Sequence, residues 1–464
     1  MTEDEISIKN KTSYLIVLFI LLSIFSCIIF KLSLSYAFFT SIIFCSYIYK
    51  KNGLPVLKTL NIIKETLIEC KSLIILIISI GAIISAWLIS GIVPAMMYYG
   101  LEYMQNLNFL LAAFIITSLV SFFMGTAIGT VSTIGIALLG LGKAFGIPGY
   151  ITLGVIISGA SIGDRISPIS SLCNLTIEGM KTNYKNTLKS VLTTLIPEYF
   201  ICCFIYYLLG KNYNISNKVS NINSLTFALN KSFHISPTLL LVPLSIVVMS
   251  FLGINILKSV SIGIILSIFS AIFIQGISLK TTILIIFTGY KAHTDFAVLN
   301  KILLSGGIIS MFGILLILIG ALSLSSLLCK TKTIDPIIKK LTSKITSKGN
   351  LIFKTGIISG LLTSISDQTV GIIIPCSFLK KKYEKMKIDN NILSRTISDT
   401  GIAIAPLIPW NANALFIVAV TGISVSLYLP YAVLCYVAPI ITFSTAFLTS
   451  CTKSHKCYIP KLHE

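Results

Sequence analysis

The sequence predicts an all-α membrane protein that crosses the bilayer many times. Of its 464 residues, 55% are hydrophobic and only 11% are charged. Soluble domains carry about 25% charged residues, so roughly half of the usual charge is missing. Apolar runs of ~20 residues, the length that spans a bilayer as a helix, recur from Tyr14 to Leu448. Some of these runs are interrupted by glycine, proline, hydroxyl and carboxylate side chains, a pattern that predicts broken helices.

The apolar runs predict about 11–13 transmembrane segments. They lie near 13–31, 33–49, 72–97, 109–124, 150–166, 189–209, 237–254, 257–277, 281–297, 302–328, 351–366, 397–415 and 429–449. A polar linker at 211–236 separates a predicted first transmembrane repeat, 1–210, from a second, 237–464. No polar segment is long enough to fold as a separate soluble domain.

The charge distribution favours lipid over nucleic acid as a partner. The net charge is +20, from 36 Lys and Arg residues against 16 Asp and Glu residues. The lysines cluster in loops beside apolar spans, as in 330–348 and 380–387, which fits the positive-inside rule and anionic headgroups. We therefore expect membrane lipid and no nucleic acid as a partner. Because 50–71 is rich in lysine and 98–108 contains none, we also predict a cytoplasmic N-terminus.

Two interrupted apolar segments occur in the same order in each half of the chain. The first half has GTAIGTVSTIGIAL at 125–138 and SGASIGDRISPISSLCNLT at 158–176. The second half has TSISDQTVGIIIPCSF at 363–378 and RTISDTGIAIAPLIPWNANA at 395–414. Paired interrupted segments predict a transporter built from two repeats, with its binding site near the middle of the membrane.

Three aspartates lie within these segments: Asp164, Asp367 and Asp399. A carboxylate at membrane depth costs ~2.5–3.5 kcal/mol, so a free one facing lipid is disfavoured. Broken helices offer carbonyl and hydroxyl oxygens, the ligands that a hard cation such as Na+ requires. Candidate ligands and supporting residues beside the aspartates are Thr126, Ser167, Pro168, Ser170, Asn174, Thr400, Pro406, Pro409, Trp410 and Asn411. We expect competition between a proton and a cation here; the alternative is that each aspartate caps a helix.

Arg165 and Arg395 are the only arginines, and both adjoin these motifs. A guanidinium can neutralise a neighbouring carboxylate or hold the carboxylate of a substrate, whereas the alternative is a charge at the membrane surface. Glu198, and Asp295 near His293, are further candidates for proton relay; for Asp295 and His293 a loop position is favoured.

Soluble-enzyme signals are missing from the sequence. It contains no P-loop, GxSxG or HExxH motif, so we expect neither an enzyme nor a resident cofactor. Its eleven cysteines form no CxxC or Cys/His pattern, so neither a disulfide framework nor a zinc site is predicted.

Five segments in order resemble the NhaC family of Na+/H+ antiporters, within the wider ion transporter superfamily. They are IGAIISAWLISGIVPAMMYYG (80–100), SGASIGDRISPIS (158–170), LLSGGIISM (303–311), LSRTISDTGIAIAPLIPWNANA (393–414) and YLPYAVLCYVAPI (428–440). The resemblance implies an inverted repeat with re-entrant hairpins, and exchange of Na+ or Li+ for protons across a bacterial plasma membrane. It marks site residues in both halves: Asp164, Ser167, Pro168, Ser170, Asn174, Asp367, Asp399, Pro406, Pro409, Trp410 and Asn411. We expect Na+ at Asp164 and Asp399, facing each other, with the prolines, Trp410, Thr126, Arg165 and Arg395 in supporting positions. A homodimer is compatible with the resemblance.

One departure from the family keeps a second hypothesis open. The family motif usually continues Ser-Asp-Thr-Thr-Asn, where this chain has Ser170, Ser171, Leu172, Cys173 and Asn174. A hard cation would lose good ligands there. The alternative is therefore a Na+- or H+-coupled carrier of amino acids or of organic acids such as malate or lactate. A channel, or a membrane enzyme using buried acids, is less favoured.

Overall fold

The structure is a computed structural model that describes residues 10–30, 32–104, 107–213, 219–296, 299–300, 303–342, 345 and 347–451. The regular structure in these ranges is helical, and extended backbone pairs in an isolated bridge between Lys291 and Leu304. The all-α prediction is confirmed.

The helices follow one another with short connections. The first third contains α1 (Asn10–Ile29), α2 (Leu34–Lys51), α3 (Val56–Glu69), α4 (Lys71–Ile89), α5 (Ile92–Met104), α6 (Phe109–Met124), α7 (Ala127–Thr130), η1 (Val131–Gly135) and α8 (Ile136–Ala144). The middle contains α9 (Gly149–Ile166), α10 (Ser171–Met180), α11 (Tyr184–Lys211), α12 (Val219–Ser232), η3 (Pro237–Leu240), α13 (Leu241–Phe251), α14 (Ile256–Phe273) and α15 (Leu279–Thr288). The last third contains α17 (Met311–Lys330), α18 (Asp335–Thr342), α19 (Lys348–Ile365), α20 (Gln368–Lys385), α21 (Asn390–Ile397), η4 (Ser398–Ile402), η5 (Ala405–Leu407), α22 (Ala412–Thr421), α23 (Val425–Tyr428), η6 (Leu429–Tyr431) and α24 (Val433–Cys451).

The helices confirm a multi-pass membrane protein. Among the described residues, six helices are long and apolar enough to cross a membrane: Lys11–Ile29, Lys71–Ile89, Ala127–Ala144, Tyr184–Lys211, Ile256–Phe273 and Met311–Lys330. Three bent helix pairs raise the number of candidate spans to as many as 9. The sequence-based number of segments was higher because it counted each interrupted apolar run, and the interruptions leave several helices short or bent.

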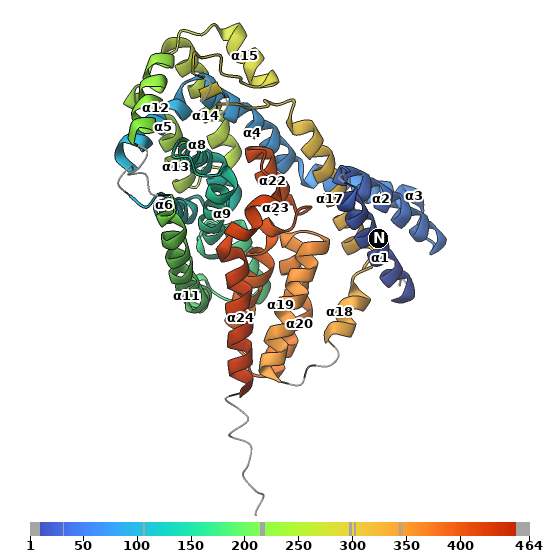
Figure 1. Cartoon of the computed structure of the whole chain (residues 1–464). Helices are drawn as coiled ribbons and strands as arrows, with labels where there is room; N and C mark the ends of the chain where they lie inside the picture. The colour runs from blue at the N-terminus through green and yellow to red at the C-terminus, as the bar shows by residue number, and fades with distance from the viewer. Residues whose placement is uncertain are drawn as a thin grey trace, which may run out of the picture.

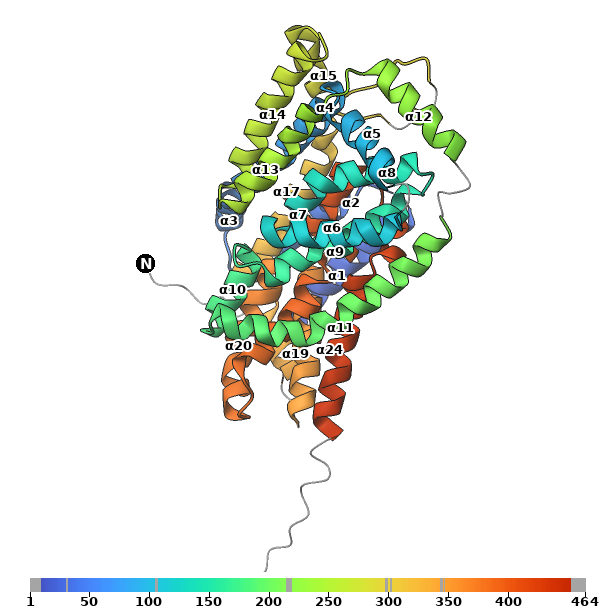
Figure 2. The same cartoon turned by 90° about the vertical axis from the view of Figure 1, so that its left-hand side faces the viewer.

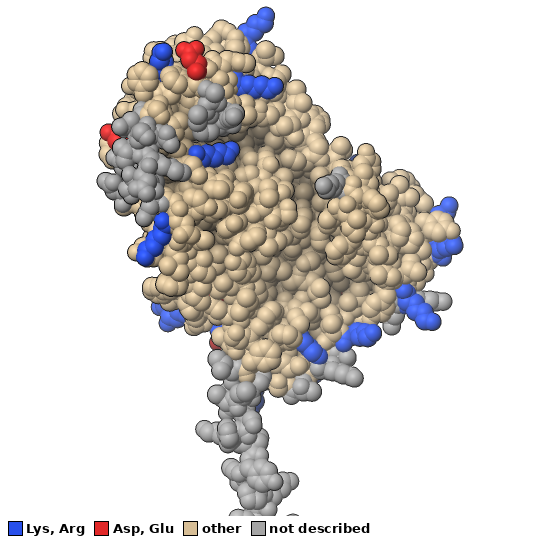
Figure 3. All heavy atoms as spheres, in the orientation of Figure 1, with Lys and Arg blue, Asp and Glu red and all other residues tan. Residues whose placement is uncertain are grey.

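The surface has the charge distribution of a protein embedded in lipid. The face shown in Figure 3 is almost free of charged side chains, and its lysines lie mainly toward the edges of the view. Large apolar side chains such as Phe200, Phe204 and Phe269 are exposed on the long helices. In water such exposure would be costly, whereas lipid tails accommodate it.

Helix α9 lies at the centre of the bundle (Figures 1 and 2). Every side chain from Ile151 to Arg165 is buried. Glycines let its neighbour α6 approach closely: a Cβ on Gly159 would collide with Thr117, and a Cβ on Gly163 with the backbone of Ser121. Small residues at helix contacts are the usual means of tight packing in membranes. This packing fixes the last turn of α9, which carries Asp164 and Arg165.

Two groups of elements follow the same order in the two halves. In 109–211, a helix pair broken at Gly125 and Thr126 precedes the interrupted α9–α10 segment and the long α11. In 348–451, the pair α19–α20, broken at Asp367, precedes the interrupted α21–η4–α22 segment and the long α24. The division into two repeats at 211–236 and their inverted relation both stay predictions. The predicted polar linker contains helix α12, which buries Leu225, Ala228 and Leu229.

Candidate functional site

The connection between α9 and α10 is shaped by its own side chains. Pro168 disfavours a helical conformation at Ser167, which is extended (φ −71°, ψ 135°) and ends α9. The Ser170 hydroxyl accepts from the Cys173 N–H, which caps α10, and donates to the Asp164 carbonyl at 3.0 Å. These bonds hold the helix break beside the buried end of α9.

A buried ion-pair cluster, hereafter the Arg165 cluster, consists of Arg165, Glu198, Asp399, Thr194 and Thr442. Arg165 Nη1 lies 2.6 Å from Glu198 Oε2, Arg165 Nη2 lies 3.3 Å from Glu198 Oε1, and Nη2 also bonds Asp399 Oδ1. The hydroxyls of Thr194 and Thr442 donate to Asp399 Oδ2 at 2.8 and 2.5 Å. The three charged side chains have no exposed surface.

The cluster joins the two halves of the chain. Arg165 comes from α9, and Glu198 and Thr194 lie one turn apart on the same face of α11. Asp399 lies in η4, a π-helical turn, and Thr442 lies on α24. Such π-helical turns occur often at functional sites. The cluster therefore lies where the first half meets the second.

The charges of the cluster do not balance. When Glu198 and Asp399 are both ionised, one guanidinium faces two carboxylates, which leaves one negative charge without a partner in the cluster. Arg395 acts on Glu198 electrostatically from outside the cluster but pairs with neither carboxylate among the described residues. A buried charge without a direct partner is unfavourable. One proton or one monovalent cation would make the cluster neutral.

Asp164 has a separate environment. It is 5% exposed, and its Oδ1 accepts from the Ala127 N–H at 3.1 Å. That N–H belongs to the first residue of α7, so the carboxylate lies at the positive end of the α7–η1–α8 helix. Thr126 precedes this helix in extended conformation. Among the described residues no hydrogen bond or ion pair joins Asp164 to Asp399; Arg165, the next residue, makes that contact instead.

Asp367 and Asn411 cap helices in the second half. Asp367 Oδ1 accepts from the Val370 N–H at 3.0 Å and caps α20. Asn411 caps α22 through the Asn413 N–H and donates to the Thr363 carbonyl at 3.1 Å. Asp367 thus makes the hydrogen bond of a helix cap, which was the alternative to a role as an ion ligand.

The other predicted residues of the second half also have local partners. Trp410 Nε1 donates to the Ser364 carbonyl at 2.5 Å, and Thr400 donates to the Thr396 carbonyl at 2.6 Å. The Pro406 carbonyl accepts from Tyr428, and Pro409 lies half-buried between η5 and α22.

The remaining candidates lie outside the Arg165 cluster. Arg395, on α21, donates to the Thr193 hydroxyl on α11 at 3.0 Å. Asn174 donates to the Pro168 carbonyl at 3.0 Å. The Ser167 hydroxyl is fully buried and finds no hydrogen-bond partner in the described part of the chain. Other buried hydroxyls, such as those of Thr363 and Ser394, also lack a partner, so this feature alone does not single out Ser167.

Sequence reasoning missed two members of the Arg165 cluster and undervalued a third. Glu198 is the only acid in α11, a 28-residue helix that is long and apolar enough to cross a membrane. A single acid in an apolar span is costly unless it has a partner. This signal could have selected Glu198 as a site residue from the sequence. Thr194 and Thr442 resemble the many other hydroxyl residues of the spans, so the pattern alone does not select them.

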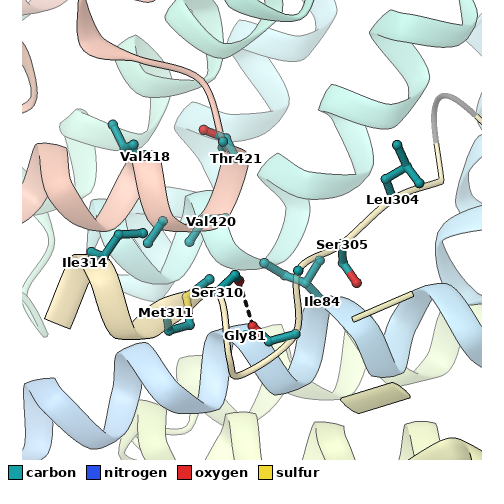
Figure 4. Close-up of a pocket in the computed structure, with 14 residues that line it drawn as sticks. Gly81, Ile84, Leu304, Ser305, Ser310, Met311, Ile314, Val418, Val420 and Thr421 are labelled. Atoms are coloured by element: carbon teal, nitrogen blue, oxygen red, sulfur yellow. Dashed lines mark hydrogen bonds between the residues drawn. The ribbon is translucent and has the colours of Figure 1, made fainter. Parts of the chain in front are cut away.

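A pocket of about 360 Å³ lies away from the cluster, among α4, α17 and α22 (Figure 4). Its lining combines Gly81 and Ile84 with the loop before α17 and the end of α22, and among the described residues that line it none is charged. The Ser310 hydroxyl there donates to the Gly307 carbonyl at 2.8 Å. The pocket therefore offers no charged group to a substrate.

Comparison with known proteins identifies the family. The model of the Na+/H+ antiporter family matches residues 172–449, more than half of the chain. The chain belongs to the Na+/H+ antiporter family. It is 31% identical to the Na+/H+ antiporter NhaC of Bacillus subtilis over 81% of the chain and 83% of that protein. It is 30% identical to NhaC of Alkalihalophilus pseudofirmus, with 80% of each chain covered.

A further relative differs in its substrates. The malate-2H+/Na+-lactate antiporter of Bacillus subtilis is 30% identical over 79% of this chain and 78% of that protein. The NhaC resemblance seen in the sequence is thus confirmed. Membership of the antiporter family makes the chain a transporter, and it leaves the exchanged substrates to be argued from the site.

Proposed function

We propose that this chain exchanges Na+ or Li+ for protons across the bacterial plasma membrane. The observation that carries the proposal is the charge of the Arg165 cluster, in which two buried carboxylates face one guanidinium. Either a proton or a Na+ ion brings the sum of charges to zero. Because both together would leave an excess positive charge, occupancy by one disfavours the other. That mutual exclusion is what antiport requires.

The ligands offered to a cation are oxygens. Asp399 contributes a carboxylate, and the hydroxyls of Thr194 and Thr442 lie within hydrogen-bond distance of it. Hard cations favour carboxylate, hydroxyl and carbonyl oxygens. Asp164, with the unpaired hydroxyl of Ser167 three residues away, is the second candidate position for Na+. We assign Na+ to Asp399 first because the charge imbalance lies there.

An organic acid is the second candidate substrate, supported by the malate/lactate relative. Such a substrate needs a free guanidinium or helix N-terminus for its carboxylate. Here both Nη atoms of Arg165 bond protein carboxylates. The N-terminus of the α7–η1–α8 helix holds Asp164, and that of α20 holds Asp367. Because the protein's own carboxylates occupy Arg165 and these two helix N-termini, cation exchange is favoured at the cluster. Arg395 bonds the Thr193 hydroxyl and no carboxylate among the described residues, and it keeps the organic acid as the second candidate.

The residues that depart from the family motif lie at the start of α10. Ser171 is exposed, Leu172 is half-buried and Cys173 is buried. None of them bonds a member of the Arg165 cluster in the described structure. A Na+ ion at Asp399 therefore does not require them.

The test is exchange in liposomes containing the purified protein and an internal pH indicator. Addition of Na+ or Li+ outside should drive protons out, and Asp399→Asn should abolish this response. Asp389→Asn is the matched control, since Asp389 is exposed and caps α21, and Asn caps as well as Asp. No proton efflux with any cation, in vesicles that respond to short-chain carboxylates or amino acids, would refute Na+/H+ exchange and support the organic substrate.

A further inference from the structure

We propose that Arg165 is a built-in competitor for the transported cation: it holds Asp399 in the cation-free protein and yields that carboxylate when Na+ binds. This inference rests on the proposed exchange of Na+ at Asp399. It assigns to the arginine a role beyond neutralising buried acids, because the guanidinium and the Na+ ion would take turns on the same oxygen.

The geometry gives Arg165 a second partner to remain with. Its two Nη atoms bond both oxygens of Glu198, at 2.6 and 3.3 Å, whereas Nη2 alone bonds Asp399. Planar, two-point pairing of a guanidinium with a carboxylate is the stronger arrangement. Arg165 can therefore release Asp399 and stay paired with Glu198, so the release does not leave a buried arginine without a carboxylate.

Asp399 is likewise prepared for the exchange of partners. The guanidinium occupies Oδ1, and the two threonine hydroxyls hold Oδ2. Loss of the guanidinium would free Oδ1 and keep the carboxylate in place. Thr194 and Thr442 donate from different helices, α11 and α24, which fixes the orientation of the carboxylate from two sides.

The competition also affects the contact between the two halves of the chain. Arg165 and Glu198 belong to the first half, and Asp399 belongs to the second. While Arg165 bonds Asp399, a buried ion pair joins the halves; when Na+ replaces it, that direct bond is absent. Cation binding would thus remove one link across the surface at which repeat transporters change conformation.

The total charge of the cluster, compared among the native protein and two variants, distinguishes a competing arginine from a purely structural one. Without Na+, the sum of charges with both carboxylates ionised is −1 in the native cluster and zero in Glu198→Gln. In the double variant Arg165→Gln with Glu198→Gln the sum is again −1, and no guanidinium is present. Glu198→Gln keeps the shape of the side chain, whereas Arg165→Gln shortens it and leaves a space beside Asp399, so the folding of the double variant is checked before the titration. A competitor therefore predicts that the double variant binds Na+ most tightly, the native protein less so and Glu198→Gln most weakly.

The experiment is Na+ titration of the purified full-length proteins, with choline keeping the ionic strength constant and thermal stabilisation as the readout. Loss of one hydrogen bond to a charged group corresponds to about tenfold in affinity, so we expect the double variant to bind Na+ about tenfold more tightly than the native protein and Glu198→Gln to bind it more weakly than the native protein. Lys189→Gln, an exposed charge removed from the same helix as Glu198, is the control and should bind Na+ as the native protein does.

Each outcome decides the inference. If the folded double variant binds Na+ more weakly than the native protein, Arg165 supports the site and does not compete for it. If the double variant fails to fold, Arg165→Lys replaces it: a lysine lacks the planar fork, so its hold on Asp399 weakens and Na+ should bind more tightly. If the native protein exchanges Na+ but the Na+ affinities of the three proteins follow another order, Arg165 is not a competitor, and the proposed function still stands. Native protein without Na+ binding or exchange refutes the proposed function as well.

Discussion

The hydroxyl of Thr442 offers the sharpest test of the cation site. Thr442→Val removes a donor that lies 2.5 Å from Asp399 Oδ2 and keeps the shape of the side chain nearly unchanged. Asp399 then keeps Thr194 on Oδ2, while Arg165 bonds Oδ1. A hydrogen bond to a charged group contributes about 1.5–3 kcal/mol.

The loss should appear in the apparent affinity for Na+. In the proposed cation-bound form the guanidinium has released Asp399, so the carboxylate would depend more on its two hydroxyls. Thr442→Val would then leave the ion with one oxygen fewer nearby. A penalty at the lower end of that range, about 1.5 kcal/mol, weakens Na+ binding roughly tenfold. The assay is the initial rate of proton efflux from liposomes over a series of external Na+ concentrations.

Two further variants make the Thr442 result interpretable. Thr442→Ser restores the hydroxyl and should recover most of the affinity. Ser444→Ala removes an exposed hydroxyl from the same helix, where it bonds the Ile440 carbonyl, and should change nothing. A valine variant with native affinity and rate would show that Asp399 does not bind the cation through this arrangement.

Two other changes test the surroundings of the cluster. Gly163→Ala should lower stability by about 1–3 kcal/mol, because its Cβ would meet the backbone of Ser121 in the tight α6–α9 contact. Thermal unfolding in detergent measures this loss, and Gly313→Ala, whose Cβ meets open space, should cost nothing; equal melting temperatures for the two would refute the packing argument. Ser171→Asp, at the exposed first turn of α10, should add about 0.3–1 kcal/mol of helix stability and leave the Na+ dependence of exchange unchanged. A stronger dependence on Na+ would instead show that the missing family carboxylate sets the ion preference.

The sequence predicted the interruptions of the helices well because local chemistry determines them. Pro168 and the capping hydroxyl of Ser170 break α9 from α10, and Asp367 starts α20 by capping it. These effects act over three or four residues and can be recognised from residue types. The burial of Asp164 and Asp399 followed from the cost of charge in lipid, which is equally local.

The partners of those residues were not predictable in the same way. The bond between Arg165 and Asp399 joins residues 234 positions apart, and Thr442 reaches Asp399 from a helix with many similar hydroxyls. Such contacts depend on how α9, α11 and α24 pack, and helical periodicity does not specify that. The expectation that Asp164 and Asp399 face each other stays a prediction, and it did not include the bond that the neighbouring Arg165 makes to Asp399.

Under the proposed exchange, the charge of the Arg165 cluster allows one site to serve both the proton and Na+. Loaded with a proton or with Na+, the two carboxylates and one guanidinium carry the same total charge, zero, whereas the unloaded cluster carries −1. A buried charge without a partner is costly, so the unloaded cluster is disfavoured. The proposed exchange therefore predicts that the protein changes conformation only when the cluster holds a proton or Na+. Glu198 is essential to this argument. Without it, Arg165 and Asp399 would already be neutral as a pair, and neither cargo would be needed.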